Sequence, residues 1–155
     1  MIRIYTDGAA QGNPGPGGYG VILKYKEHIK ELSQGFRLTT NNRMELLAVI
    51  TGLEAIKKGG IPVTIYSDSE YVVNAVEKGW IWVWEKKDFA KRKNPDLWRR
   101  YIPLHHQYKP KFQWVRGHAG HPENERCDYL AVKAATTAPL LVDEEYERNR
   151  DIGSQ

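Results

Sequence analysis

Three segments that are expected to form β-strands follow one another within the first 39 residues of the chain. Apolar and polar side chains alternate along residues 2–6 and 19–25, which is the period of a strand, and residues 29–39 are expected to form the third strand. The connections between these segments are short, so the three strands are expected to form an antiparallel meander. Gly35 is expected to introduce a bulge or bend in the third strand.

A helix, a fourth strand and a second helix are predicted after the meander. Apolar residues recur at helical spacing over residues 46–56, and Asn42 is placed to cap this helix with Glu45 as its capping-box partner. Residues 63–66 form a short β-rich run, and residues 70–78 form a further helix. This order predicts a right-handed crossover that makes the first and fourth strands parallel neighbours.

The second half of the chain adds further helices and one strand. Asn94 and Pro95 begin a helix that Pro103 should kink or end early. Residues 112–115 are predicted to form the fifth strand, and a last helix runs to about residue 135. The fold class is therefore α/β, with a five-stranded mixed sheet of three antiparallel strands plus parallel strands, flanked by helices.

One domain is expected over residues 1–138, with an acidic tail over residues 139–155. The tail either folds back through residues 140–142 or stays disordered. The 155-residue chain has a net charge of +4 although residues 143–151 hold five acidic and two basic side chains. The body of the chain is thus strongly basic, which favours a polyanionic partner, nucleic acid first.

Other sequence features exclude several classes of protein. A single cysteine, Cys127, forbids an intramolecular disulfide bond and fits a reducing compartment. No apolar stretch approaches the length of a membrane span, and the N-terminus has no secretory hydrophobic region. We expect a cytoplasmic monomer without membrane contact.

Four acidic residues fall at comparable positions in this layout. Asp7 ends the first strand, Glu45 opens the first long helix, Asp68 ends the fourth strand and Asp128 lies in the last helix. The C-terminal ends of parallel neighbours meet at one edge of the sheet, and carboxylates gathered there repel one another unless a cation intervenes. Hard oxygen ligands favour Mg²⁺ or Mn²⁺, so the pattern favours metal-assisted phosphodiester hydrolysis.

Each of these carboxylates also has a purely structural explanation. Asp7 could bond to its own turn, Glu45 and Asp68 could cap helices, and Asp128 could lie on a solvated helix face. Any one of them alone is more often structural. The convergence of all four on one region favours the catalytic interpretation.

Four blocks of the sequence resemble the signature blocks of bacterial type 1 ribonuclease H. The blocks are IYTDGA followed by GNPGPGGYG, then TTNNRMEL, YSDSEY and GHAGHPENERCD, within residues 4–128. The match runs in order from about residue 2 to residue 135. It implies a ribonuclease H-like fold and an Mg²⁺-dependent endonuclease. Such an enzyme hydrolyses the RNA strand of RNA–DNA hybrids and leaves 5′-phosphate and 3′-hydroxyl ends.

The resemblance also implies roles for single residues. Asp7, Glu45, Asp68 and Asp128 would bind one or two Mg²⁺ ions per site, for which Mn²⁺ can substitute, and Asp7 would bridge two ions. His118 would shuttle protons, a task that suits imidazole near neutral pH. Without the carboxylates nearby, His118 would be interpreted as an ordinary surface-loop histidine.

Residues 80–100 resemble the basic protrusion, or handle, with which bacterial members grip the hybrid. Cations neutralise phosphates and aromatic faces pack on sugars, whereas Trp98 is expected to pack mostly in the core. Other matched positions contact the nucleic-acid backbone and minor groove, where the RNA 2′-hydroxyl is exposed. The implied substrate-binding residues are Asn13, Thr40, Asn41, Trp80, Lys86, Lys87, Lys91, Arg92 and Lys93.

Two alternatives to a hybrid-specific nuclease stay open. A catalytically silent duplex-binding module is disfavoured because a pure binder has no reason to place four anions beside a phosphate groove. A related nuclease that acts on DNA is not excluded by the fold alone. One departure from many relatives is Glu70, which stands where they carry glutamine and adds an anion near the groove.

Overall fold

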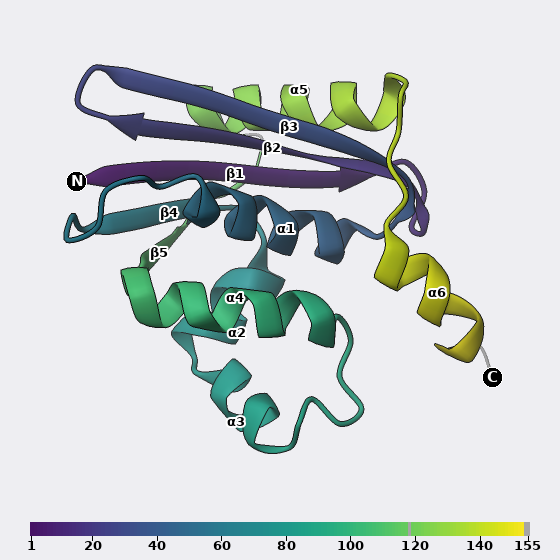
Figure 1. Cartoon of the computed structure of the whole chain (residues 1–155). Helices are drawn as coiled ribbons and strands as arrows, with labels where there is room; N and C mark the ends of the chain where they lie inside the picture. The colour runs from purple at the N-terminus through teal and green to yellow at the C-terminus, as the bar shows by residue number, and fades with distance from the viewer. Residues whose placement is uncertain (118, 154–155) are drawn as a thin grey trace.

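The computed structural model describes residues 1–117 and 119–153, and its strands form one sheet with helices on both faces (Figure 1). The strands are β1 (Ile2–Ala10), β2 (Gly15–Tyr25), β3 (His28–Thr39), β4 (Val63–Ser67) and β5 (Lys111–Trp114). The helices are α1 (Asn41–Glu54), α2 (Glu70–Glu77), α3 (Trp80–Lys86), α4 (Pro95–Tyr108), α5 (Pro122–Thr136) and α6 (Glu144–Gly153).

The sheet has the strand order β3-β2-β1-β4-β5. β1 to β3 form an antiparallel meander, and β4 is parallel to both β1 and β5. The predicted five-stranded mixed sheet and the parallel pairing of the first and fourth strands are thus confirmed. Because β1 and β4 run in the same direction, their C-terminal ends lie at the same edge of the sheet.

The first strand is longer than predicted. Its parallel pairing with β4 ends at Tyr5, opposite Tyr66, but its antiparallel pairing with β2 continues to Ala10, opposite Gly17. The prediction that Asp7 ends the strand was wrong, because β2 supplies backbone partners on one side for three more residues. Asp7 therefore lies in a part of β1 that still pairs with β2 on one side but no longer pairs with β4 on the other.

Two layers of helices cover the sheet. Figure 1 shows α5 on one face and α1 with α4 on the other. The main core lies beneath α1 and α4, where Ile4, Ile65, Leu46, Trp98 and Tyr101 are fully buried. Trp98 is therefore a core residue, as predicted. Its indole N–H donates to the hydroxyl oxygen of Tyr71 at 2.9 Å, which satisfies its polar atom within the core.

Gly35 does not form the expected bulge. It pairs regularly with Gly18, and the irregularity of this strand pair lies between Gly15 and Gly17. A side chain at Gly35 would collide with the carbonyl group of Ala134 in α5. The glycine is needed because α5 packs directly against the backbone of the meander, not because the strand bends.

Two helix ends also differ from prediction. Thr40, not Asn42, is the N-cap of α1, and its hydroxyl oxygen accepts a hydrogen bond from the backbone N–H of Arg43 at 3.2 Å. Glu45 is consequently not a capping-box partner. Pro103 does not end α4 early, because the helix continues to Tyr108.

The C-terminal segment returns to the sheet. Leu141 bonds on both sides of Phe36, donating to the carbonyl of Gly35 at 3.0 Å and accepting from the N–H of Arg37 at 2.9 Å. The chain then forms α6 beside the N-terminal end of α1 (Figure 1). Of the two alternatives for the tail, the described residues through 153 show the folded-back one. None of the helices in the described residues is long and apolar enough to cross a membrane.

Candidate active site

Three of the four predicted carboxylates meet at the C-terminal edge of the parallel strands. One oxygen each from Asp7, Glu45 and Asp68 lies within 4.8 Å of the other two. Asp7 comes from β1, Glu45 from the start of α1, and Asp68 directly follows β4. Asp7 and Glu45 are buried and Asp68 is half-buried. Three acids from distant parts of the sequence thus share one small volume.

The fourth carboxylate, Asp128, faces this group from α5. It is half-buried, and its negative charge helps to raise the pKa of Asp7. Among the described residues it lies outside the tight group of three. The structure therefore brings all four predicted carboxylates into one region, where the charges of Asp68 and Asp128 both act on Asp7.

Crowding strongly changes the acidity of this cluster. Burial, followed by the charge of Asp68, raises the pKa of Asp7 to about 8. Burial and the charges of Asp7 and Asp68 raise the pKa of Glu45 well above its usual range. Since burial and like charges disfavour the ionised forms, the group holds protons near neutral pH unless a cation replaces them.

The same cluster has a vacant acceptor. The Oδ1 atom of Asp68 is buried and has no hydrogen-bond partner in the structure, although buried polar atoms are nearly always paired. A hard cation would bind this oxygen and neutralise the negative charge of the ionised carboxylates. The donor set and the orphaned oxygen both fit a Mg²⁺ or Mn²⁺ site.

Backbone groups hold two of the carboxylates in place. The N–H of Gly8 donates to Oδ1 of Asp7 at 3.0 Å and also to Oε1 of Glu45. This one donor therefore couples the end of β1 to the first turn of α1. It fixes the two side chains relative to each other before any ligand binds.

Residues around β5 position the third carboxylate. The indole N–H of Trp114 donates to the backbone carbonyl of Asp68 at 3.3 Å, and the N–H of Val115 donates to that of Ser67 at 3.0 Å. A methyl group at Gly117 would lie 2.7 Å from Oδ2 of Asp68. Trp114 was not predicted to have this role. The alternation that places Phe112 and Trp114 on the same face of β5 was the signal available.

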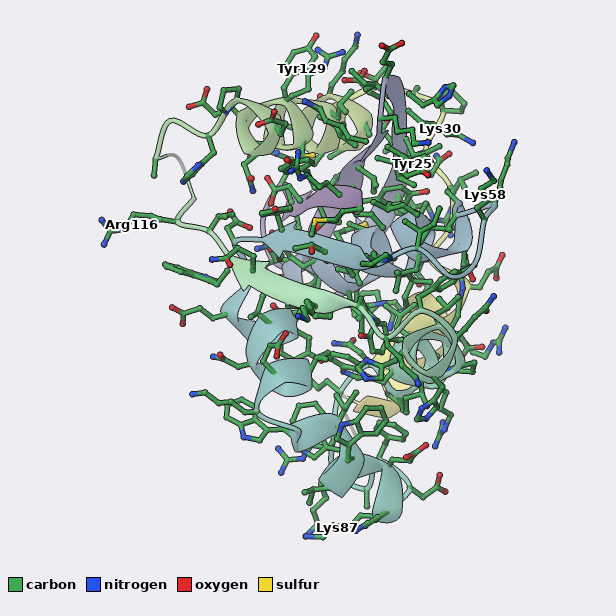
Figure 2. All side chains as sticks on the ribbon, turned by 90° about the vertical axis from the view of Figure 1, so that its left-hand side faces the viewer. Tyr25, Lys30, Lys58, Lys87, Arg116 and Tyr129 are labelled. Carbon is green, nitrogen blue, oxygen red and sulfur yellow. The ribbon has the colours of Figure 1, made fainter. Side chains whose placement is uncertain are left out.

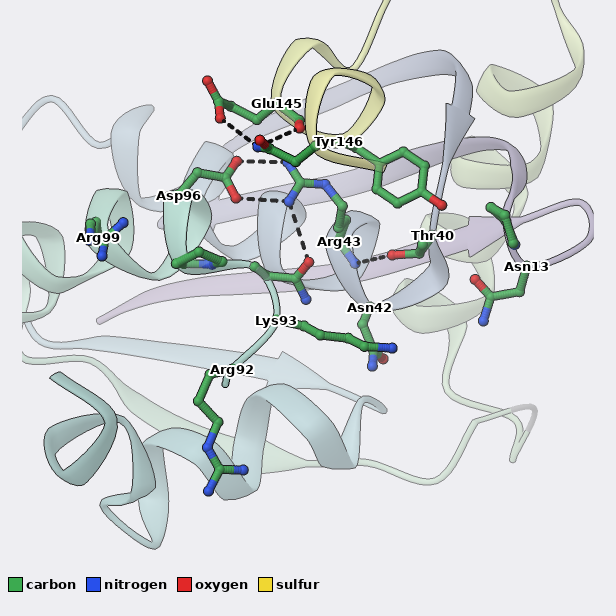
Figure 3. Close-up of a pocket in the computed structure, with 14 residues that line it drawn as sticks. Asn13, Thr40, Asn42, Arg43, Arg92, Lys93, Asp96, Arg99, Glu145 and Tyr146 are labelled. Atoms are coloured by element: carbon green, nitrogen blue, oxygen red, sulfur yellow. Dashed lines mark hydrogen bonds and ion pairs between the residues drawn. The ribbon is translucent and has the colours of Figure 1, made fainter. Parts of the chain in front are cut away.

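The predicted backbone-contacting residues gather where the β1–β2 loop meets the start of α1. The side-chain oxygen of Asn13 accepts from the N–H of Asn41 at 3.1 Å, and that of Asn41 accepts from the N–H of Ala10 at 2.9 Å. Thr40 lies next to them as the cap of α1. A groove of about 760 Å³ opens here, lined by Asn13, Thr40, Asn42, Arg43, Arg92, Lys93, Asp96, Arg99, Glu145, Tyr146 and Asn149 among others (Figure 3).

The predicted handle, residues 80–100, comprises α3, the connection over residues 87–94 and the start of α4. It forms the end of the molecule farthest from α5, where Lys87 projects into solvent (Figure 2). Trp84 packs edge-on against the buried Trp98, and Arg92 lies 5.1 Å from the centre of the Trp84 ring. The predicted cations of the handle are all exposed; they are Lys86, Lys87, Lys91, Arg92 and Lys93.

Trp80 of the handle is partly exposed, with Lys78 5.4 Å from its ring centre. His118, the predicted proton shuttle, lies outside the described residues. Its neighbour Gly117 does lie against Asp68, so the loop reaches the carboxylates immediately before position 118.

Comparison with known proteins decides between the families that could use such a site. The family model described as RNase H matches residues 1–136. The chain belongs to the ribonuclease H family. It is 58% identical over 147 residues to the ribonuclease H of Desulforamulus reducens, with 92% of each chain covered. It is 57% identical over 151 residues to that of Syntrophus aciditrophicus, covering 94% of this chain and 87% of the relative.

Solved structures agree with the ribonuclease H assignment. LC9-RNase H1, a type 1 enzyme with the type 2 active-site motif, superposes with a TM-score of 0.77 at 32% identity, covering 95% of this chain and 79% of that one. LC11-RNase H1, solved in complex with an RNA/DNA hybrid, gives a TM-score of 0.66 at 28% identity, covering 87% of this chain and 96% of that one.

The raised pKa values of Asp7 and Glu45 predict a pH-dependent stability of the metal-free protein. Because the pKa of Asp7 is higher in the folded than in the unfolded chain, this group stabilises the fold at low pH and loses that effect as pH rises towards 8. One extra bound proton changes the free energy of unfolding by about 1.4 kcal/mol per pH unit, or roughly 3 °C in melting temperature. Thermal melts in EDTA at pH 5 to 9 measure it.

Mg²⁺ should prevent much of this loss of folding stability at high pH, since it competes with protons for the same carboxylate oxygens. The stabilisation by Mg²⁺ is therefore expected to be larger at pH 8.5 than at pH 5. The variant Asp7→Asn supplies the control, because it deletes one titrating group. A metal-free melting temperature that rises steadily from pH 5 to 8 would contradict the prediction.

Proposed function

We propose that this chain is an endonuclease that hydrolyses the RNA strand of RNA–DNA hybrids. The observation that carries the proposal is the cluster of Asp7, Glu45 and Asp68, with one oxygen from each within 4.8 Å of the others, in a chain of the ribonuclease H family. The hybrid held by LC11-RNase H1 supports the substrate. Cleavage is expected to leave 5′-phosphate and 3′-hydroxyl ends.

The proposal includes Mg²⁺ as the cofactor, one or two ions held by Asp7, Glu45, Asp68 and Asp128. Such an ion lowers the pKa of a bound water and stabilises charge on the phosphate. The protein's own task is positioning: Gly8 orients Asp7 and Glu45, while the bonds from β5 fix Asp68. The carboxylates are thus held in place by the fold before substrate arrives.

Substrate recognition is assigned to the groove and the handle. Asn13, Thr40 and Asn41 lie at the junction of the β1–β2 loop and α1, where they would contact the nucleic-acid backbone and the minor groove. A contact there can sense the 2′-hydroxyl that distinguishes RNA from DNA. His118 is proposed to move protons at the reacting phosphate, from a loop whose preceding residue already lies against Asp68.

Labelled hybrid, duplex DNA and duplex RNA, each with and without Mg²⁺, test the proposal directly. Cleavage of the RNA strand of the hybrid alone, and only with metal, is the expected result. Binding to all three without cleavage would show a silent binding module, and cleavage of duplex DNA would show a DNA nuclease. The proposal also includes that the protein is a monomer and is located in the cytoplasm. Size-exclusion chromatography tests the first point and cell fractionation the second.

Removal of the handle cations is expected to weaken hybrid binding and reduce its salt dependence. The variant carries Lys86→Ala, Lys87→Ala, Lys91→Ala, Arg92→Ala and Lys93→Ala. Each phosphate contact that is lost should reduce the log–log salt slope by about 0.7 to 0.9. The turnover rate at saturating hybrid should change much less, because these side chains lie on the handle and not among the carboxylates. Binding isotherms at several salt concentrations measure the slope.

The matched control removes exposed lysines at the other end of the molecule. Lys30 and Lys58 lie far from Lys87 in Figure 2, and Lys57 adjoins Lys58. The triple alanine variant of Lys30, Lys57 and Lys58 should leave the salt slope nearly unchanged. Equal salt slopes for the handle variant and the unaltered protein would show that the handle cations do not contact the phosphates of the hybrid.

A further inference from the structure

The groove at the start of α1 has a wall outside the part of the chain that the family model matches. The match ends at residue 136, whereas α6 places Glu145, Tyr146 and Asn149 in the lining of the groove. Asn13 and Thr40, two of the proposed substrate-binding residues, line the same groove. Figure 3 shows the Tyr146 ring extending from α6 towards Thr40.

One end of this wall is anchored by a buried carboxylate. Asp143 accepts two hydrogen bonds from the guanidinium of Arg43, at 2.8 and 3.0 Å, and one from the hydroxyl of Thr39 at 2.8 Å. Its Oδ1 also accepts from the backbone N–H of Tyr146 at 3.4 Å, which caps α6. The start of α6 is thus tied to the first turn of α1, next to Thr40.

The next turn of α6 is anchored separately. Glu147 accepts two hydrogen bonds from Arg37 of β3, both at 2.9 Å. Because Asp143 and Glu147 lie on either side of Tyr146, the base of its side chain is held at two points. The backbone at Tyr146 is therefore held beside the groove that its side chain lines, so less of it needs to be ordered when a ligand binds.

The charges around Tyr146 favour a phosphate-bearing ligand. Arg92 and Lys93 line the groove across from α6, and both are exposed. Glu145, the acidic residue beside Tyr146, is engaged by Arg148 at 2.8 Å and by Asn149 at 3.1 Å. An aromatic ring facing cations across a groove is a combination typical of nucleic-acid contact sites.

We infer that Tyr146 is a further hybrid-binding residue, whose ring packs on the sugar–phosphate backbone of the strand that passes Thr40. The inference rests on the proposed function and adds to it a contact from the C-terminal helix. Asp143 is then a positioning residue, since it touches no ligand and acts by holding Tyr146 and the α1 turn together.

Binding of a labelled hybrid to variants in an Asp7→Asn background tests the inference without cleavage. Tyr146→Ala should weaken binding about fivefold or more, the lower end of the loss when a stacking aromatic is removed. Tyr146→Phe should bind like the parent, because the ring and not the hydroxyl makes the contact. In the active background Tyr146→Ala should raise KM and leave kcat nearly unchanged.

Tyr129→Ala is the matched control, since Tyr129 is 50% exposed on α5, on the far face of the sheet. It should bind hybrid like the parent. If Tyr146→Ala lowers the melting temperature, Tyr146→Leu serves as a second variant, because it keeps an apolar side chain at this position. Tyr146→Leu should still bind hybrid more weakly than Tyr146→Phe. Unchanged binding by both Tyr146→Ala and Tyr146→Leu would overturn the inference and leave the proposed function intact. Failure of the Asp7→Asn parent to bind hybrid would instead overturn the proposed function.

Discussion

Asp7→Asn is expected to abolish cleavage and to preserve hybrid binding. Asp7 interacts with each of the other three carboxylates, so it is the central ligand of the proposed metal site. Asparagine keeps the shape of the side chain but removes its negative charge, and with it the main attraction for a divalent cation. Loss of metal-assisted charge stabilisation corresponds to about 10³-fold or more in turnover.

Binding should hold or tighten in this variant, because an anion that would face the phosphates has gone. The metal-free protein should also melt higher, since the substitution removes one of the charges that raise the pKa of Glu45. Single-turnover assays, hybrid binding and thermal melts measure the three effects. Asp88→Asn supplies a matched control on the handle, where the Asp88 side chain is 93% exposed. Normal turnover of Asp7→Asn in Mg²⁺ would contradict the assignment of Asp7 as a metal ligand.

Local sequence patterns predicted the antiparallel meander, the parallel pairing of the first and fourth strands and the meeting point of the carboxylates. The alternation in β1 and the strand–helix–strand passage through β4 were sufficient, because buried faces must repeat with the period of their secondary structure. The carboxylates followed from topology: Asp7 and Asp68 are two residues beyond the paired Tyr5 and Tyr66. Such positions depend on the order of the elements and not on side-chain detail.

The errors arose where distant contacts decide the local structure. Gly35 has the sequence signal of a bulge, but Ala134, about a hundred residues later, is what requires a glycine there. Asn42 and Thr40 both suit an N-cap, and the backbone geometry of the preceding strand selects Thr40. Trp114 was interpreted only as a strand residue because its bond to the Asp68 carbonyl joins two separate strands.

The anchoring of the tail was equally hidden from sequence patterns. Asp143 belongs to an acidic run that looks solvent-exposed, yet only 8% of it is exposed because Arg43 lies beneath it. Arg43 in turn stands in a helix turn that sequence analysis assigned to capping and catalysis. Charge pairs between residues a hundred positions apart leave no periodic signal, so the buried network appears only in three dimensions.

Arg43→Ala is expected to have the largest effect on stability. Arg43 is 5% exposed, and its guanidinium donates two hydrogen bonds each to Asp96, at 2.7 and 2.9 Å, and to Asp143. Burial alone would lower the pKa of Arg43, but its bonds to Asp96 and Asp143 outweigh this, and the pKa is raised. Alanine would leave two carboxylates without their cation, one of them buried.

Breaking a buried ion pair by removing one partner costs about 3 to 5 kcal/mol, which corresponds to roughly 6 to 20 °C in melting temperature. Arg37→Ala is the matched control, because the Arg37–Glu147 pair is bidentate too but the Arg37 side chain is 60% exposed. That pair should contribute about 0 to 1 kcal/mol. Thermal and urea unfolding of both variants measure the difference, and equal losses would contradict a special role for burial.

A neutralised triple variant separates charge from packing. Arg43→Met combined with Asp96→Asn and Asp143→Asn should recover much of the stability that Arg43→Ala loses, because no buried charge is left unpaired. Its hybrid affinity, like that of Arg43→Ala, is expected to stay below that of the unaltered protein, since α6 would still lack the two bonds from Arg43 to residue 143 that hold Tyr146 in the groove. Recovery of both stability and affinity would show that α6 docks without this network, and that Asp143 does not position Tyr146.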